Sequence, residues 1–155
     1  MVLKMKVIEI INNKFLSLFK KYIEILEAEA VNLSDINSPL DYNKVIKEGG
    51  AAEGSRAILA YYLAIYKMVG EQGNEVNGPI VIDTPNQQEQ SDSNYANIVT
   101  LLTQEIDNTN QVILCAMENE HVEPFKKTAH IIKLGKDKLL SKEKFELIKK
   151  EYNLN

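Results

Sequence analysis

The chain has 155 residues, a length that fits one domain, and its 45% share of hydrophobic residues is enough for a packed core. Its 26% share of charged residues is ordinary for a soluble globular protein. The net charge of −4 excludes a global basic field that would attract nucleic acid, so such contacts would need a local basic patch near the C-terminus.

Cysteine usage and hydropathy bear on where the protein works. The single cysteine, Cys115, cannot form an internal disulfide, which fits a reducing cytosol. No segment reaches the roughly 18 apolar residues that a membrane span needs. The N-terminus also lacks the pattern of a secretory signal peptide. We therefore expect a cytoplasmic protein without membrane contact.

Residues 7–30 form the first predicted element, a helix whose apolar positions alternate in steps of three and four. These positions form an a/d heptad stripe: Ile8, Ile11, Phe15, Leu18, Tyr22 and Ile25. Two interpretations stay open. The helix packs on a globular core through this stripe, or it is the stub of a coiled coil. We treat residues 1–33 as this N-terminal helical segment and residues 34–155 as the main domain.

A loop and a buried helix follow. Residues 32–43 are rich in Asn, Ser and Asp, which predicts a loop. A helix begins near Ser55, and its body, residues 57–66, is apolar nearly all round, as expected of a helix at the centre of a domain. Gly70 and Gly73 are expected to end this helix.

Two buried strands come next. Residues 79–83 and 111–116 are continuous apolar runs, typical of parallel strands that are covered on both faces. A helix capped by Ser91 or Asp92 is expected between them and runs to about residue 107.

The C-terminal part is expected to add one strand and one helix. Residues 129–134 predict a third strand, and Ser141 can cap a last helix. That helix would turn Phe145, Ile148 and Tyr152 inward. The order of elements predicts an α/β fold, a layered domain built on a parallel sheet.

The end of the first strand carries the candidate for chemistry. An apolar strand that ends in Asp83 and is followed at once by a loop is a Walker-B-like arrangement. The strand fixes the carboxylate at the edge where open α/β sheets bind ligands, and there it can hold the Mg²⁺ of a nucleotide through a water. Many parallel strands also end in Asp as a turn former or helix cap, and that alternative stays open.

Three segments resemble, in consistent order, the heads of ABC-type ATPases. Residues 50–59, GAAEGSRAIL, resemble the signature SGGEKSRAxL, and a long helix follows in both. Residues 79–86, PIVIDTPN, resemble the family's apolar strand ending in DEPT, and residues 111–116 stand where the family has its switch strand. The chain thus resembles the C-terminal half of an SMC/RecN-like head, a P-loop-NTPase-like fold. Its DTPNQQ form resembles prokaryotic members linked to DNA repair or phage defence.

The resemblance implies roles for the matched residues. Backbone N–H groups at the start of the helix would face the γ-phosphate of ATP held by a partner head, because a helix N-terminus favours an anion. Ser55 and Arg56 would position that turn. The implied cofactor-binding residues are Gly49, Gly50, Ala51, Ala52, Glu53, Ser55 and Arg56. Asp83 would be the metal-linked carboxylate, and Gln87 or Gln88 would orient water or cross a dimer interface. A flexible turn before a helix is the alternative explanation for Gly49 and Gly50.

The departures from the family pattern limit the expected activity. Gly50 replaces the signature serine, and Thr84 replaces the catalytic Glu; threonine cannot act as a general base at neutral pH. No P-loop is present, because the glycine spacing of residues 49–54 is followed by Ser55 and Arg56 and not by Lys. In heads of this kind the P-loop precedes a coiled-coil insertion, so a chain that starts at the returning coil lacks it. We expect no ATP hydrolysis by the chain alone.

Two functions are compatible with the sequence. One is a half ATPase head that uses ATP and Mg²⁺ only with a P-loop-bearing N-terminal half or partner ATPase subunit. The other is a non-enzymatic interaction module with a remnant ATPase fold. A small-molecule enzyme is disfavoured, since Cys115, His121 and His130 form no nucleophile–base motif. An open sheet edge predicts an oligomer. The lysines of residues 126–150 are either a solvated surface or a DNA contact made through the assembly.

Overall fold

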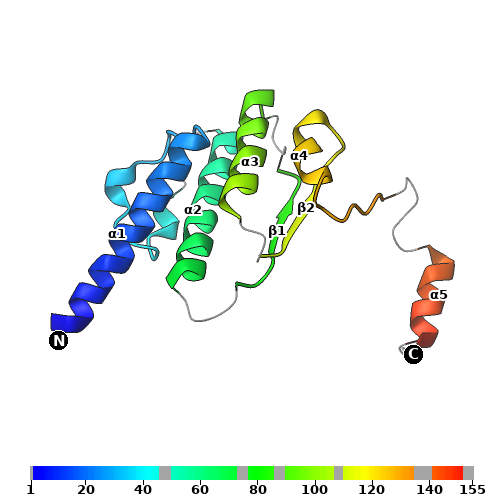
Figure 1. The fold of residues 1–155 in the computed structure, drawn as a ribbon, viewed down its shortest axis with the longest axis horizontal. Helices are drawn as coiled ribbons and strands as arrows, with labels where there is room; N and C mark the ends of the chain where they lie inside the picture. Colours follow the sequence, from blue (N-terminus) through cyan, green and yellow to red (C-terminus); the bar gives the residue numbers. More distant parts are fainter. Residues whose placement is uncertain are drawn as a thin grey trace. The chain divides into compact units, whose positions relative to one another are not determined.

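Helices make up most of the described chain, and two parallel strands form its sheet (Figure 1). The computed structural model describes residues 2–45, 50–72, 77–85, 90–106, 110–134 and 141–151. The chain divides into two compact units, Met1–Pro124 and Phe125–Asn155, and each is described by itself. The elements in chain order are α1 (Val2–Ile25), η1 (Leu33–Asp35), η2 (Tyr42–Lys44), α2 (Ala51–Gln72), β1 (Ile80–Asp83), α3 (Asp92–Glu105), β2 (Val112–Cys115), η3 (Glu120–Val122), α4 (Glu123–Lys126) and α5 (Lys142–Glu151).

The core of the first unit forms where α1 packs on α2. Phe15 and Phe19 on α1 stack with their ring centroids 5.6 Å apart. The ring of Tyr61 on α2 meets these two rings edge-on, at 5.3 and 5.9 Å. All three side chains are buried, so they add the favourable edge contacts of aromatic rings to the burial of apolar area. The predicted apolar stripe therefore packs on a core through the C-terminal half of α1.

The N-terminal half of α1 leaves its apolar side chains exposed. Val7, Ile8 and Ile10 are 49%, 57% and 59% exposed. An open groove of about 460 Å³ follows this half of the helix, and its lining residues are Met5, Ile8, Glu9, Asn12, Asn13, Leu16 and Asn37. The apolar stripe is therefore buried in the C-terminal half of α1 and exposed in the N-terminal half. A coiled coil remains a prediction for the exposed half.

Helix α2 begins at Ala51, earlier than the predicted start near Ser55. Gly54 is accommodated in its first turn, where its N–H donates to the carbonyl of Gly50 at 2.9 Å. The apolar body of this helix, residues 57–66, predicts burial all round, and this is wrong for one side, where Tyr62 is 52% exposed. The reason is geometric, since α1 can pack along only one side of α2.

The end of α2 is closed by a side chain from the following segment. The amide Nδ2 of Asn77 donates to the carbonyl of Tyr66 at 3.2 Å. A Cβ atom at Gly70 would clash with this amide, so glycine is needed there for Asn77 to reach the helix. Gly73, the second predicted stop, lies outside the described residues.

The sheet lies where the sequence predicts its first two strands. β1 and β2 are parallel, with Ile80 opposite Val112 and Asp83 opposite Cys115. Helix α3 connects them, and the hydroxyl of its N-cap, Ser91, accepts from the N–H of Asn94. One face of α3 is buried and consists of Tyr95, Ile98, Val99, Leu101 and Leu102. A strand–helix–strand unit of this kind needs a helical crossover to keep its strands parallel.

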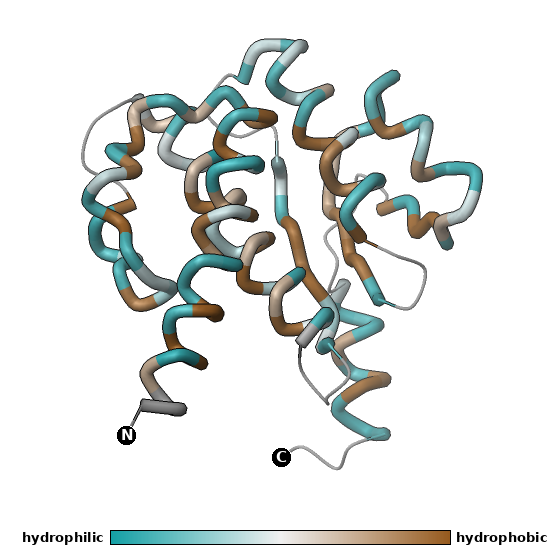
Figure 2. Tube along the Cα trace, turned by 60° about the vertical axis from the view of Figure 1, so that its left-hand side comes forward, coloured by the Kyte–Doolittle hydropathy of each residue, from teal (hydrophilic) through white to brown (hydrophobic). Residues whose placement is uncertain are grey.

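One face of this sheet is covered and the other is open. Ile82 is 9% exposed, whereas Val81 and its cross-strand neighbour Ile113 are 61% and 43% exposed. Burial on both faces was predicted, and this is wrong for the face that carries Val81. In Figure 2 the traces of the two strands are brown over most of their length, which marks their hydrophobic residues. Parallel sheets are normally covered on both sides, so the described residues leave an apolar surface that a second layer would ordinarily bury.

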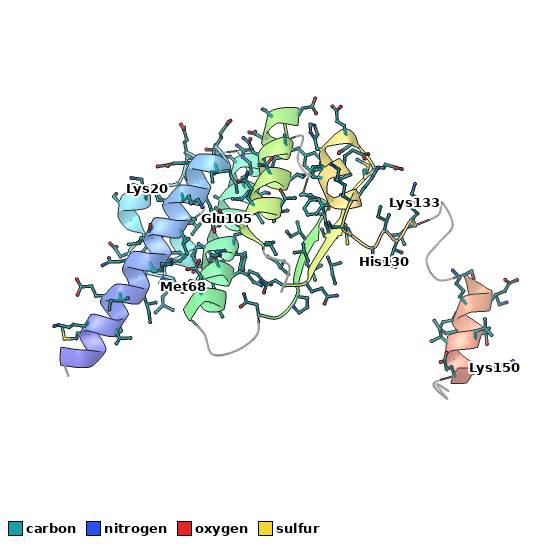
Figure 3. All side chains as sticks on the ribbon, viewed as in Figure 1. Lys20, Met68, Glu105, His130, Lys133 and Lys150 are labelled. Carbon is teal, nitrogen blue, oxygen red and sulfur yellow. The ribbon has the colours of Figure 1, made fainter. Side chains whose placement is uncertain are left out.

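The second unit contains no third strand among its described residues. The segment from His130 to Leu134 is irregular and exposed, with Ile132 74% exposed (Figure 3). A strand needs a neighbour for its backbone groups, and the described residues of this unit contain no strand that could pair with this segment. α5 forms after Ser141 as predicted, but Phe145 and Ile148 are 46% and 42% exposed and do not turn inward. Tyr152 lies outside the described residues.

Apolar stretches in the helices are interrupted by charged residues, as in the last turns of α2 with Lys67 and Glu71. Among the helices of the described ranges, none is long and apolar enough to cross a bilayer.

Candidate functional site

Four chain segments of the first unit lie toward the same side of that unit, and hydrogen bonds join three of them: the end of α1, the start of α2 and the start of α3. In Figure 1 the carboxyl end of β1, the first turns of α2 and α3, and the last turn of α1 all lie toward the upper side. The carboxyl edge of a parallel sheet is where open α/β folds bind ligands, and helix N-termini there present backbone N–H groups. Most of the predicted site residues lie on these segments.

Asp83 is the last residue of β1 and its side chain is exposed. Its position matches the prediction of a carboxylate at the carboxyl edge of the sheet. Mg²⁺ that arrives with a nucleotide needs only one or two protein carboxylates, because phosphate oxygens and water fill the other positions. A single exposed carboxylate fits that mode of binding. The described residues contain no cluster of three or more His, Cys, Asp or Glu side chains able to hold a metal ion.

Thr84, directly after Asp83, has an unusual backbone conformation. Its φ angle is 44°, in the left-handed region that β-branched residues avoid. Such a conformation costs about 1–3 kcal/mol and occurs mostly at functional or tightly constrained positions. Its N–H donates to the carbonyl of Cys115 at 2.8 Å, so the two strands are still joined beyond the last pair of the sheet. The backbone strain therefore falls directly after Asp83, at the carboxyl end of β1.

The signature-like segment forms the first turn of α2. Gly50 precedes the helix, and a Cβ atom there would meet no atom within 4 Å, so crowding does not require glycine. Ala51 is exposed and Ala52 is half-buried at the start of the helix. The hydroxyl of Ser55 donates to the carbonyl of Ala51 at 3.0 Å. A carboxylate oxygen of Glu53 accepts from the N–H of Ala30 at 2.6 Å, which ties this turn to the segment after α1.

Arg56 makes the most extensive contacts of the predicted site residues. It is 7% exposed, and its Nε donates to the carbonyl of Leu26 at 2.7 Å. Its Nη2 donates to the carbonyl of Glu27 at 3.0 Å, and its Nη1 donates to the side-chain oxygen of Gln90. The guanidinium therefore sits at the carbonyl end of α1, where the helix dipole favours a cation. The structure places Arg56 inside the protein, in contact with other segments of the chain.

Gln90 belongs to the site but was missed by the sequence reasoning. It is 8% exposed, and its Nε2 donates to the carbonyl of Ala52 at 2.8 Å while its Oε1 accepts from Arg56. In the sequence it stands in a polar run that predicts a loop, so no local pattern distinguishes it. Three other predicted site residues, Gly49, Gln87 and Gln88, lie outside the described residues.

The remaining candidates for chemistry do not form a catalytic group among the described residues. Cys115 is exposed at the end of β2. His121 is half-buried, and its ring meets the buried ring of Tyr95 edge-on at 5.5 Å, a contact expected of a packed histidine. Burial raises the pKa of Tyr95, and a hydrogen bond with Asn119 partly offsets this effect.

Comparison of the chain with known protein families, with curated proteins and with solved structures finds no match.

Proposed function

We propose that this chain is the C-terminal half of an SMC/RecN-like ABC ATPase head, which takes part in ATP hydrolysis only when joined to a half or partner subunit that carries a P-loop. The observation that carries the proposal is the position of Asp83 at the carboxyl end of β1 in a parallel strand–helix–strand unit, with the first turn of α2 toward the same side of the unit (Figure 1). The strained backbone of Thr84 at that edge supports it. From the sequence resemblance, we place such a head in DNA repair or phage defence, with DNA contact made through the whole assembly.

The residues of this chain would divide the work at the site between them. Asp83 would hold Mg²⁺ through water, and the amide groups at the start of α2 would donate to the phosphate of an ATP bound by the partner. When bound there, Mg²⁺ neutralises charge on the transferred phosphoryl group. Thr84 supplies no general base, so the residue that activates water must come from elsewhere in the assembly.

Reconstitution with a P-loop-bearing half tests this function directly. That half is to be taken from the coding sequence next to the gene, and ATP hydrolysis is measured for each chain alone and for the mixture. We expect hydrolysis in the mixture and none from this chain alone. Asp83→Asn should lower kcat in the mixture by about 100-fold or more, in line with the loss of a preorganised transition-state contact. Glu120→Gln, at an exposed carboxylate of η3, is the matched control and should leave kcat unchanged.

Two results would contradict the proposal. One is tight binding of Mg-ATP by the chain alone in calorimetry, since half a head lacks the phosphate-binding loop. The other is an unchanged kcat of the mixture with Asp83→Asn. The second result would favour the alternative function, a non-enzymatic interaction module, which the open face around Val81 and the threonine at position 84 also suit.

A further inference from the structure

We propose that Gln90 and Arg56 are positioning residues that fix the first turn of α2 to the end of α1 and to the start of α3. Arg56 and Gln90 are the two buried polar or charged residues of the described chain. They contact each other, and between them they reach three segments that are far apart in the sequence. The proposal concerns the geometry of this chain. It rests on the proposed function only for the identity of what the first turn of α2 would contact.

The guanidinium of Arg56 is costly to bury, which argues that it has a purpose beyond filling space. Its partners are two backbone carbonyls and one neutral amide oxygen, and no carboxylate of the described residues forms an ion pair with it. A buried charge in such surroundings is weak evidence for added stability, because an apolar side chain of similar volume often serves as well. What an apolar side chain cannot do is hold three acceptors in a fixed planar geometry.

The end of α1 is shaped to present these carbonyls. The N–H of Ala28 donates to the carbonyl of Ile23 at 3.0 Å, and the N–H of Glu27 donates to that of Glu24 at 3.3 Å. Glu27 has a φ of 51°, so the helix ends in a left-handed residue, as in a Schellman motif. The carbonyls of Leu26 and Glu27 accept from Arg56, which joins the last turn of α1 to α2.

Gln90 closes the connection on the other side. Its amide uses both ends: Oε1 accepts from Arg56, and Nε2 donates to the carbonyl of Ala52 in the first turn of α2. Ser91, the next residue, is the N-cap of α3. The start of α3 is therefore held to the same turn whose amide groups would face a nucleotide, and the orientation of that turn depends on Gln90 as well as on its own helix.

Amide hydrogen exchange of the intact chain tests this joint. Gln90→Ala should speed exchange at least tenfold for the amides of residues 26–28 and for the amide of Gly54, whose bond to the carbonyl of Gly50 closes the first turn of α2, while the amides around Leu63 and Ala64 stay protected. Gln90→Glu keeps the acceptor for Arg56 but loses the donor to Ala52, so it should loosen the first turn of α2 and leave residues 26–28 protected. Gln104→Ala removes an exposed glutamine of α3 and should change neither region.

Uniform acceleration along all of α2 in both Gln90 variants, or no acceleration in either, would overturn the proposal. In the reconstituted head, Gln90→Ala should lower kcat and leave KM for ATP unchanged, because the partner's P-loop holds the nucleotide. If Gln90→Ala speeds amide exchange but leaves kcat unchanged, Gln90 has a structural role alone, and this result would also overturn the proposal. If the unmodified head hydrolyses no ATP, the proposed function fails, and the exchange pattern still decides whether the joint exists.

Discussion

At the scale of single residues, Glu105 is the other point where distant segments meet (Figure 3). Its carboxylate accepts from the hydroxyl of buried Tyr22 at 2.8 Å and lies 2.5 Å from the ammonium of Lys21, both on α1. Its backbone carbonyl accepts from Lys67 on α2 at 3.3 Å. Burial raises the pKa of Glu105, but the hydrogen bonds from Lys21 and Tyr22 outweigh it, so the pKa lies below its ordinary value. Burial, and then the bond to Glu105, raises the pKa of Tyr22.

This contact predicts a pH dependence of stability. A carboxylate whose pKa is lower in the folded chain stabilises it fully above the ordinary value of 4.5, and the effect is lost as pH falls through the lower folded value. Glu105→Gln should lower the free energy of unfolding by about 1–2 kcal/mol at pH 7. The free energies of unfolding of the wild type and of Glu105→Gln, both measured in urea, should differ less as the pH is lowered below about 4.5.

The wild type must be compared with Glu105→Gln at each pH, because other carboxylates titrate in the same pH range. A hydrogen bond from Lys44, followed by one from the backbone of Asn37, lowers the pKa of Asp41 to about 2. This effect is common to the wild type and the variant, and it cancels in the difference. A difference in stability that stays constant down to pH 3 would contradict the assignment.

The predictability of the site differs from residue to residue. Asp83 could be placed at the end of a strand, because an apolar run stopped by Pro85 leaves little choice. The matched motif also singled out Arg56. Its partners could not be predicted, since two of them are backbone carbonyls that become available only through the way α1 ends. Gln90 had no signal in the sequence, because its role comes from position in space.

At the scale of elements, α1 is one helix with two environments. Phe19 is fully buried against α2, while Ile8, on the exposed half, is 57% exposed. Truncation of a buried aromatic side chain removes its burial and leaves a cavity. Phe19→Ala should therefore lower the free energy of unfolding by about 3–5 kcal/mol, measured in urea by far-ultraviolet circular dichroism. Ile8→Ala, the control on the same helix, should change it by less than about 0.5 kcal/mol.

Equal effects of the two substitutions would show that the exposed half of α1 is covered in solution. That result would point to self-association of this helix and would call for measurements at several protein concentrations.

The success of the element predictions follows from the kind of signal that each element gives. β1, β2 and α3 were found because each has a strong local pattern between clear turn residues. The start of α2 was missed because Gly54 is a poor helix former, and a tertiary contact of Glu53 with Ala30 holds the turn nevertheless. Residues 129–134 have the composition of a strand, but pairing decides whether a strand forms, and composition contains no information about an absent neighbour.

At the scale of the whole molecule, the open face of the sheet predicts self-association. Val81 and Ile113 form an exposed apolar pair on parallel strands, which are normally covered on both faces. Light scattering of the purified chain should give a mass above that of one chain, and Val81→Lys should shift it toward the monomer. Leu40→Lys is the control, because Leu40 is 91% exposed in the loop after α1 and should not affect the mass.

A monodisperse monomer for the unmodified chain would contradict this prediction. It would also remove the main structural reason to expect that the sheet needs a second layer.

The sequence predicts that helices alternate with parallel strands, and the first unit has this alternation. The sequence could not show how much of the sheet would be covered, because burial depends on how segments that are distant in the sequence pack in space. In our proposal, a complete layered P-loop-like fold forms around β1 and β2 only in the assembly with the P-loop-bearing half.

Helix α1 and the Arg56 contact together have a mechanical consequence. With 24 residues, α1 is about 36 Å long, and its N-terminal end lies far from the carbonyls that Arg56 holds. Phe15 and Phe19 pack the C-terminal half of the helix on α2, so only the exposed half can act as a lever, and its pivot is this aromatic contact. A load applied to the exposed half of α1 is therefore borne by the core between α1 and α2 before it reaches the Arg56 contact at the other end of the helix.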